Sequence, residues 1–284
     1  MPIRTVWLGL NFEEAALENI EESYACETYA VELCIREQAH LSVFLAAPVF
    51  NIPRVIPGAG LVASAAEDEV NANRHARAEE AQGRIASAVK SASISAEFHI
   101  AQESYSQLGE SLSASAGPSD IIILSRPGCY LSLDRKLIEA MLFTSGRPIV
   151  LVPPKWARGA RLEKVIVAWD GSGRAARAVG DAMPLLARSD EVEIVSVSAD
   201  ASKKSIPSTT LLAHLTRHCR KVVAAYLPMQ PGGIAETLRA HAAMARANLL
   251  VMGGYAHTRV LETVLGGVTR DMLAEAELPL FLSH

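Results

Sequence analysis

The chain has 284 residues, of which 50% are apolar and 20% are charged, and its formal net charge is −4. This composition excludes an intrinsically disordered chain, which would be poor in apolar residues and high in net charge. It also argues against a nucleic-acid-binding protein built on a basic face. The length predicts two domains of ordinary size.

In the first half, short apolar runs predicted as strands alternate with longer stretches predicted as helices. A segment with two prolines and two glycines, Phe50–Ala63, interrupts this alternation and predicts a loop insertion. The expected strands are Ile3–Leu10, His40–Pro48, Ile94–Ala101, Asp120–Leu124 and Arg147–Pro154, and the expected helices are Glu13–Gln38, Glu67–Ser91, Ser104–Ala116 and Lys136–Phe143.

The second half repeats this plan. The expected strands are Lys164–Trp169, Val192–Ser198, Val222–Leu227, Asn248–Met252 and Leu278–Leu282, and the expected helices are Arg174–Ala187, Thr209–Arg220, Gly233–Arg246 and Leu261–Ala276. Two apolar landmarks recur, DIIILS with NLLVMG and RPIVLV with LPLFLS. They indicate an internal repeat of about 130 residues.

The alternation predicts the α/β class, with two Rossmann-like domains, each a five-stranded, mainly parallel sheet flanked by helices. We place the domains at residues 1–155 and 160–284, with a linker near Trp156–Arg161. In such sheets a ligand binds beyond the carboxyl ends of the strands, where the strand order reverses. The loops after the first and fourth strands of each half are therefore the candidate sites.

The first candidate motif is Asp170-Gly-Ser-Gly173, directly after the first strand of the second half. Asp170 could bind a ligand at the strand end, and the glycines allow a tight turn into the helix. A plain turn in which Asp170 caps the helix explains the same residues. The glycines also fit the GxGxxA dinucleotide fingerprint, but the nearest acid beyond the next strand is Asp200, so this match is weak.

The second candidate segment follows the fourth strand of the second half. Its glycines include Gly253 and the pair Gly266–Gly267, which precedes a predicted helix. Free backbone amides at a helix start bind anions, so phosphates could lie between the two glycine clusters. A pair of ordinary turns is the alternative.

The element order, Asp170 and a glycine loop that leads into LGGVTR (265–270) resemble the universal stress protein family in its tandem form. The resemblance implies an adenine nucleotide alpha hydrolase-like fold. It also implies a G-x2-G-x9-G-S/T motif that holds ATP phosphates, and an acid after the first strand that contacts the adenosine. Asp170 matches the acid, and Gly253 and Gly266 match the first and third glycines.

Two positions depart from that motif. Ala256 stands in place of the second glycine, and Gly267 in place of the Ser/Thr hydroxyl. The two changes predict ATP binding weakened by about 10- to 1,000-fold, and Trp169 could fill the base pocket. The first half lacks the motif, and Asn11 replaces its acid, so we expect it to bind no nucleotide.

Other catalytic or metal-binding chemistry is sparse. His214 and His218 are four residues apart on a predicted helix beside Cys219, but no further ligand has an obvious register, so we predict no metal site. Cys26 and Cys34 are about 12 Å apart along one predicted helix and cannot form a disulfide. With Cys129 they are expected to be reduced, and we predict no catalytic residue.

These features together predict a stress-response protein that acts by binding, with ATP and Mg²⁺ in the second half as the expected cofactor. The resemblance implies contact across the fifth strands, which gives an intramolecular pseudo-dimer to which a second chain can add as a homodimer. No apolar run reaches the about 18–20 residues of a membrane span, and no secretory signal is evident, so a cytoplasmic location is expected. A weak ATPase, a dinucleotide-dependent enzyme and a nucleotide-free interaction module remain alternatives.

Overall fold

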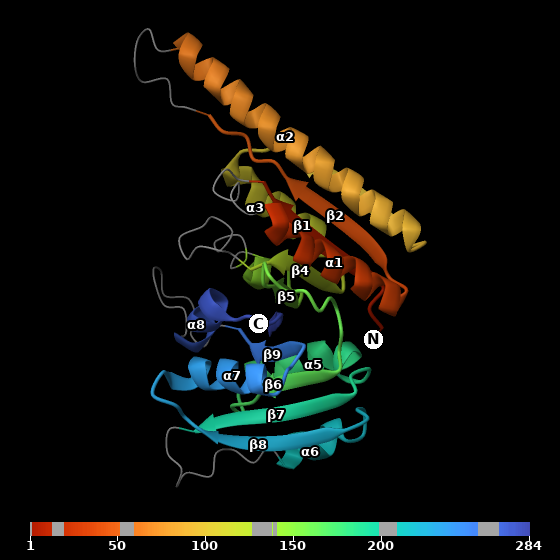
Figure 1. The fold of residues 1–284 in the computed structure, drawn as a ribbon, viewed down its shortest axis with the longest axis vertical. Helices are drawn as coiled ribbons and strands as arrows, with labels where there is room; N and C mark the ends of the chain where they lie inside the picture. The colour runs from red at the N-terminus through yellow and green to blue at the C-terminus, as the bar shows by residue number, and fades with distance from the viewer. Residues whose placement is uncertain are drawn as a thin grey trace.

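The protein forms one ten-stranded sheet between two layers of helices, as the computed structural model in Figure 1 shows. The structure describes residues 2–12, 20–51, 60–126, 138, 141–198, 209–254 and 267–284. The α/β class and the mainly parallel sheet predicted from the sequence are confirmed.

The strands lie in the order β3-β2-β1-β4-β5-β10-β9-β6-β7-β8. Their bounds are β1 Thr5–Asn11, β2 His40–Ala46, β3 Ala96–Ala101, β4 Ile121–Ser125, β5 Ile149–Val152, β6 Lys164–Ala168, β7 Glu191–Ser198, β8 Val222–Pro228, β9 Leu249–Gly253 and β10 Leu280–Ser283. The helices are α1 Ile20–Glu37, α2 Gly60–Ser91, α3 Tyr105–Ala116, α5 Gly173–Leu186, α6 Thr209–Leu215, α7 Gly233–Met244 and α8 Gly267–Glu275.

The two closing strands, β5 and β10, meet at the centre of the sheet. They pair antiparallel, with Val150 opposite Phe281, whereas the other strand pairs are parallel. Read outward from this pair, both halves have the same strand order, so the repeated landmarks correspond to repeated topology. The halves share one sheet, and the boundary between residues 155 and 160 stays a prediction.

Each face of the sheet carries its own core. Alternate residues of β1 show the division, because Val6 and Leu8 belong to the core that includes residues of α1, α2, α5 and α6. Trp7 belongs to the core on the other face, which includes residues of α3, α7 and α8. All three side chains are fully buried. Successive strand residues point to opposite faces, so near-continuous apolar runs are what a sheet covered on both faces requires.

Helix α2 corrects one sequence prediction. The glycines and prolines before it predicted a loop through Ala63, but the helix begins at Gly60 and runs for 32 residues to Ser91. The prolines end at Pro57, and the alanine-rich run after Gly60 favours a helix. The helix lies along β2 and β3 at one end of the molecule in Figure 1.

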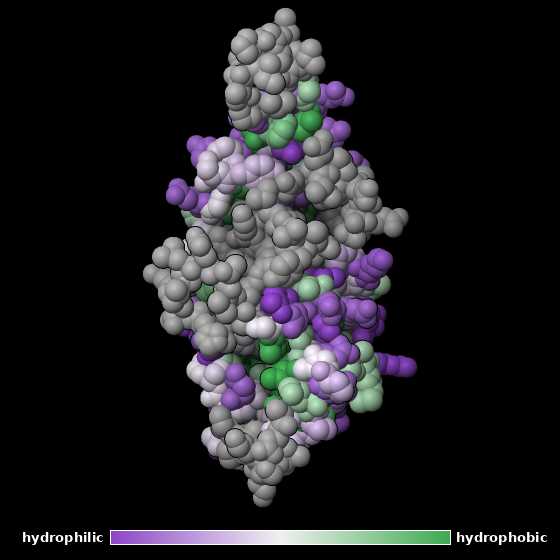
Figure 2. All heavy atoms as spheres, turned by 90° about the vertical axis from the view of Figure 1, so that its left-hand side faces the viewer, coloured by the Kyte–Doolittle hydropathy of each residue, from purple (hydrophilic) through white to green (hydrophobic). Residues whose placement is uncertain are grey.

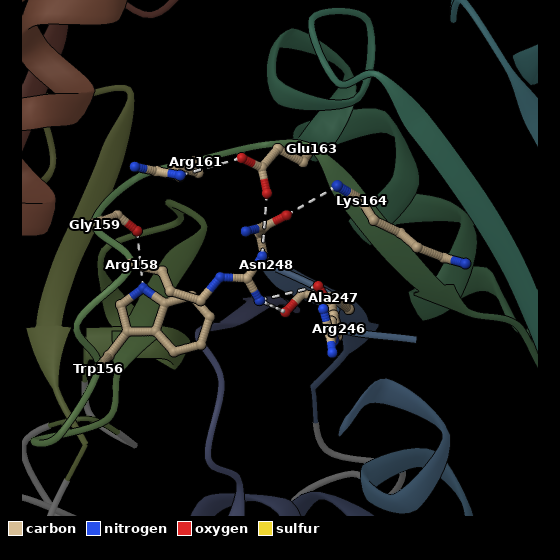
Figure 3. A network of polar contacts seen from close by, with 9 residues as sticks. All are labelled: Trp156, Arg158, Gly159, Arg161, Glu163, Lys164, Arg246, Ala247 and Asn248. Carbon is tan, nitrogen blue, oxygen red and sulfur yellow. Dashed lines mark hydrogen bonds and ion pairs between the residues drawn. The ribbon is translucent and has the colours of Figure 1, made fainter. Parts of the chain in front are cut away.

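The linker between the halves is held by arginine and tryptophan side chains (Figure 3). Trp156 Nε1 donates to Gly159 O (2.8 Å). Arg158 lies over the Trp156 ring, donates to Arg246 O (3.0 Å) after α7, and pairs with Glu163 (3.1 Å). The linker is therefore fixed to the second half.

Helix α1 of the first half also contacts the linker. The Ala160 amide donates to Glu32 Oε2 (2.9 Å). Gly159 has a φ of +58°, and a Cβ there would lie 1.8 Å from the same oxygen, so only glycine fits. A second contact joins the halves where Glu37 ends α1, because Arg188 Nη1 lies 3.0 Å from Glu37 Oε1.

Candidate functional site at the carboxyl edge of the second half

The strand order reverses between β6 and β9, where the sequence placed a ligand site. These strands pair in parallel, with Val167 opposite Val251, so they end side by side. Asp170 follows β6, and Gly253 is the last residue of β9. The structure therefore brings these two predicted site residues to one edge of the sheet.

Asp170 takes part in the turn that starts α5. The Ser172 amide donates to Asp170 Oδ1 (2.9 Å), and Ser172 Oγ accepts from the Ala175 amide (3.1 Å) as the N-cap. Gly171 has a φ of +78°, which explains a glycine at that position. The turn interpretation of this motif is thus correct, but Ser172 rather than Asp170 caps the helix. The exposed carboxylate of Asp170 keeps a second oxygen for a ligand.

Gly253 is explained by packing. A Cβ at this position would lie 2.8 Å from the carbonyl carbon and the Cβ of Arg174, and 2.9 Å from the Ala175 amide. The start of α5 therefore approaches β9 so closely that a larger residue has no room. Next to it, the Gly254 amide donates to Ser283 O (2.7 Å) and joins the ends of β9 and β10.

Gly267 is the first residue of α8. It is exposed, and a Cβ there would meet no atom within 4 Å. The other two predicted site residues, Ala256 and Gly266, lie outside the described residues, as do Asp200 of the dinucleotide alternative and Cys129.

Trp169, predicted as a candidate to fill a base pocket, is half-buried. Its ring packs against the core on the α1 and α5 face, and its amide donates to Val195 O (2.8 Å). Its carbonyl accepts a hydrogen bond from Ser196 Oγ (2.8 Å). The backbone before Asp170 is therefore fixed to β7 on one side.

The matching edge of the first half is used differently. Arg126, which directly follows β4, donates through Nη1 to Leu273 O (3.2 Å) and Ala274 O near the end of α8. A cation there offsets the partial negative charge of the helix end. No pattern in the sequence indicated this contact, because Arg126 and Leu273 are 147 residues apart.

A buried charged network in the second half also escaped the sequence analysis. Glu193 on β7 lies 2.8 Å from Lys164 Nζ and 3.0 Å from His241 Nε2. The side chains of Glu193 and His241 are 9% and 13% exposed. The pattern that could have indicated this network is the alternation of Glu191 and Glu193 with apolar residues in β7. The network ties β6, β7 and α7 together.

The predicted histidine pair lies partly beyond its helix. Helix α6 ends at Leu215, so His218 lies in the following turn, with its ring centroid 5.0 Å from that of His214. Within the described ranges, no three His, Cys, Asp or Glu side chains form a group that could hold a metal ion.

The described cysteines are buried and free, namely Cys26, Cys34 and Cys219. Burial raises the pKa of the Cys34 thiol to about 12 and also raises the pKa values of the other two. These thiols are therefore poor nucleophiles.

The face where β7 ends, at the left of Figure 1, is seen directly in Figure 2. Hydrophilic and hydrophobic residues are interspersed over the described part of this face. Among the described helices, none is long and apolar enough to cross a bilayer.

Comparison with solved structures identifies the fold. A universal stress protein from Archaeoglobus fulgidus DSM 4304 superposes with a TM-score of 0.71 at 15% identity, over 98% of this chain and 97% of that one. The chain has the universal stress protein fold. The fold expected from the sequence resemblance is therefore confirmed over nearly the full length.

Two further solved structures match. A functionally unknown protein from Pseudomonas aeruginosa PAO1 gives a TM-score of 0.50 at 16% identity, over 99% of this chain and 92% of that one. A universal stress protein in complex with cAMP covers 43% of this chain and 96% of its own at 22% identity, and its TM-score of 0.33 is too low to locate a ligand here. No family model matches the sequence, and no curated protein matches it significantly.

Proposed function

We propose that this protein is a cytoplasmic universal stress protein that binds ATP with Mg²⁺ at the carboxyl edge of its second half, and acts by binding rather than by turnover. The observation that carries the proposal is the exposed carboxylate of Asp170 at the reversal of strand order, in a chain with the universal stress protein fold. Close packing against α5 is enough to explain the glycine at position 253, so Asp170 is the stronger evidence for a ligand site.

We also propose that the chain is an intramolecular pseudo-dimer, and the pairing of β5 with β10 supports this. The central pair is antiparallel and flanked by the same strand order on both sides, which is the arrangement of a twofold dimer formed within one chain. Each half supplies one closing strand, and neither strand is left as a bare edge.

Calorimetry with ATP and Mg²⁺ tests the nucleotide site. Gly267→Ser adds the hydroxyl that the family motif has, in open space, so ATP should bind about 2- to 10-fold more tightly. Gly83→Ser on α2 is the matched control, because a Cβ at Gly83 also meets no atom within 4 Å. It should leave the affinity unchanged.

Asp170→Asn tests the adenosine side. The amide oxygen of asparagine can still accept from the Ser172 amide, so the turn is retained while the charge is lost. We expect ATP binding to weaken by at least about threefold. Equal affinity in both variants and the wild type would place the nucleotide elsewhere.

A nucleotide-free interaction module is the second candidate, and the close packing of α5 against Gly253 favours it. No heat of binding at millimolar ATP with Mg²⁺ would establish this alternative over nucleotide binding. Phosphate release in the same samples would instead indicate a weak ATPase.

A further inference from the structure

A cleft of about 530 Å³ lies at the opposite edge of the second half from Asp170. Its lining comes from the amino ends of three strands, because Glu163 directly precedes β6, Asp190 directly precedes β7, and Arg220 lies two residues before β8. The five residues of β6 separate this cleft from Asp170 by roughly 15–20 Å. It is therefore distinct from the proposed nucleotide site.

Four arginines from four separate segments line this cleft. Arg36 belongs to the last turn of α1 in the first half, Arg161 to the linker, Arg188 to the turn after α5, and Arg220 to the turn before β8. Two carboxylates, Glu163 and Asp190, line it with them. The lining thus carries an excess of two positive charges, in a chain whose net charge is −4.

Ion pairs hold three of the guanidinium groups in place. Arg161 lies 3.3 Å from Glu163, and Arg220 lies 3.1 Å from Asp190. Arg188 pairs with Glu37 (3.0 Å) and donates to Arg36 O (3.3 Å). Figure 3 shows Arg161 directed toward Glu163. The side chains of Arg161 and Arg220 are 64% and 72% exposed, so their guanidinium groups remain accessible to a ligand.

Arg36 differs from the other three. Its side chain is exposed, and within the described part of the chain its guanidinium makes no ion pair. Its positive charge is therefore available to a ligand in the cleft.

The apolar part of the lining is small and indicates what the cleft recognises. Among the described residues it consists of Leu162 and Ala187, and these include no aromatic side chain on which a base could stack. Guanidinium groups bind phosphate oxygens through paired hydrogen bonds. We propose that this cleft binds an oligophosphate, a compound with at least two linked phosphate groups, through Arg36 together with Arg161 and Arg220.

The test uses the intact protein and tripolyphosphate at low ionic strength, followed by calorimetry. Arg36→Gln should weaken binding by at least about tenfold, because it removes the unpaired guanidinium. Arg217→Gln is the matched control, since Arg217 is an exposed arginine in the turn before β8 that does not line the cleft. Equal losses in both variants, or no binding of tripolyphosphate by the wild type, would overturn the proposal.

ATP distinguishes a free oligophosphate from a nucleotide tail, and separates this cleft from the proposed nucleotide site. If the cleft accepts both a free oligophosphate and the phosphates of a nucleotide, ATP should compete with tripolyphosphate for it. Arg36→Gln should weaken this competition, and Asp170→Asn should leave it unchanged. Failure of the nucleotide site would leave tripolyphosphate binding intact. Loss of tripolyphosphate binding in Asp170→Asn but not in Arg36→Gln would contradict the assignment to the cleft.

Discussion

The two halves share a strand order but use the end of their fourth strand differently. In the first half β4 ends at Ser125, and the next residue, Arg126, reaches across to the end of α8. In the second half β9 ends at Gly253, against which the start of α5 packs. The topology therefore determines which segments meet, while the residue at the strand end decides whether the edge joins the halves or admits a neighbouring helix.

The largest effect is expected where this difference is steric. Gly253→Ala places a methyl group 2.8–2.9 Å from backbone atoms of α5, so it should destabilise the protein by about 1–3 kcal/mol in urea unfolding. Ser125→Ala, at the matching position of the first half, should change stability by less than about 0.5 kcal/mol. Similar losses in the two variants would show that the halves do not differ in this way.

A smaller effect is expected from the contact between the halves. Arg126→Ala removes the donor to the Leu273 and Ala274 carbonyls and should cost about 1–2 kcal/mol. Hydrogen exchange should accelerate in α8, although the substitution lies in the first half. Arg147→Ala is the control, because Arg147 Nε donates to Gly117 O within the first half (2.8 Å) and should leave α8 unchanged.

The smallest effect concerns the ion pair between the two halves. Burial raises the pKa of Glu37, and the Arg188 charge opposes this rise. Because the pKa of Glu37 is raised in the folded state, its contribution to the free energy of unfolding is fully present below its unfolded-state pKa of about 4.3. This contribution is lost as the pH increases through the folded-state pKa. A glutamine at this position cannot ionise, so the variant does not lose this stability as the pH increases.

Glu37→Gln should therefore gain stability relative to the wild type, by less than about 1 kcal/mol, between about pH 4 and pH 7. Urea unfolding at both pH values measures this, with Glu69→Gln, an exposed residue of α2, as the control. A loss of stability in Glu37→Gln would show that the attraction of Arg188 for the carboxylate is larger than the cost of burying it.

The sequence predicted the succession of strands and helices and its repetition in the two halves, because apolar runs and turn residues alternate regularly along the chain. It also predicted that Asp170 and Gly253 lie at one edge of the sheet, since both stand at the carboxyl ends of buried parallel strands, while a ligand site there stays a prediction. It predicted too long a loop before α2, because the glycines and prolines there hid the start of the helix at Gly60.

What it could not predict depends on distant contacts. The close approach of Arg174 to Gly253, the bond from Arg126 to α8 and the network of Lys164 and His241 around Glu193 each join segments far apart in the chain. A local pattern of hydrophobicity or turn residues contains no information about such pairs.

The ion pair between Glu37 and Arg188 has a consequence for how such a chain can arise and assemble. Each residue lies three positions before the second strand of its half, so the two occupy matching places. Two copies of the first half joined in the same way would bring two carboxylates together, and two copies of the second would bring two guanidinium groups together. The opposite charges favour the mixed pair over either like pair, so at this contact the two halves are complementary rather than interchangeable.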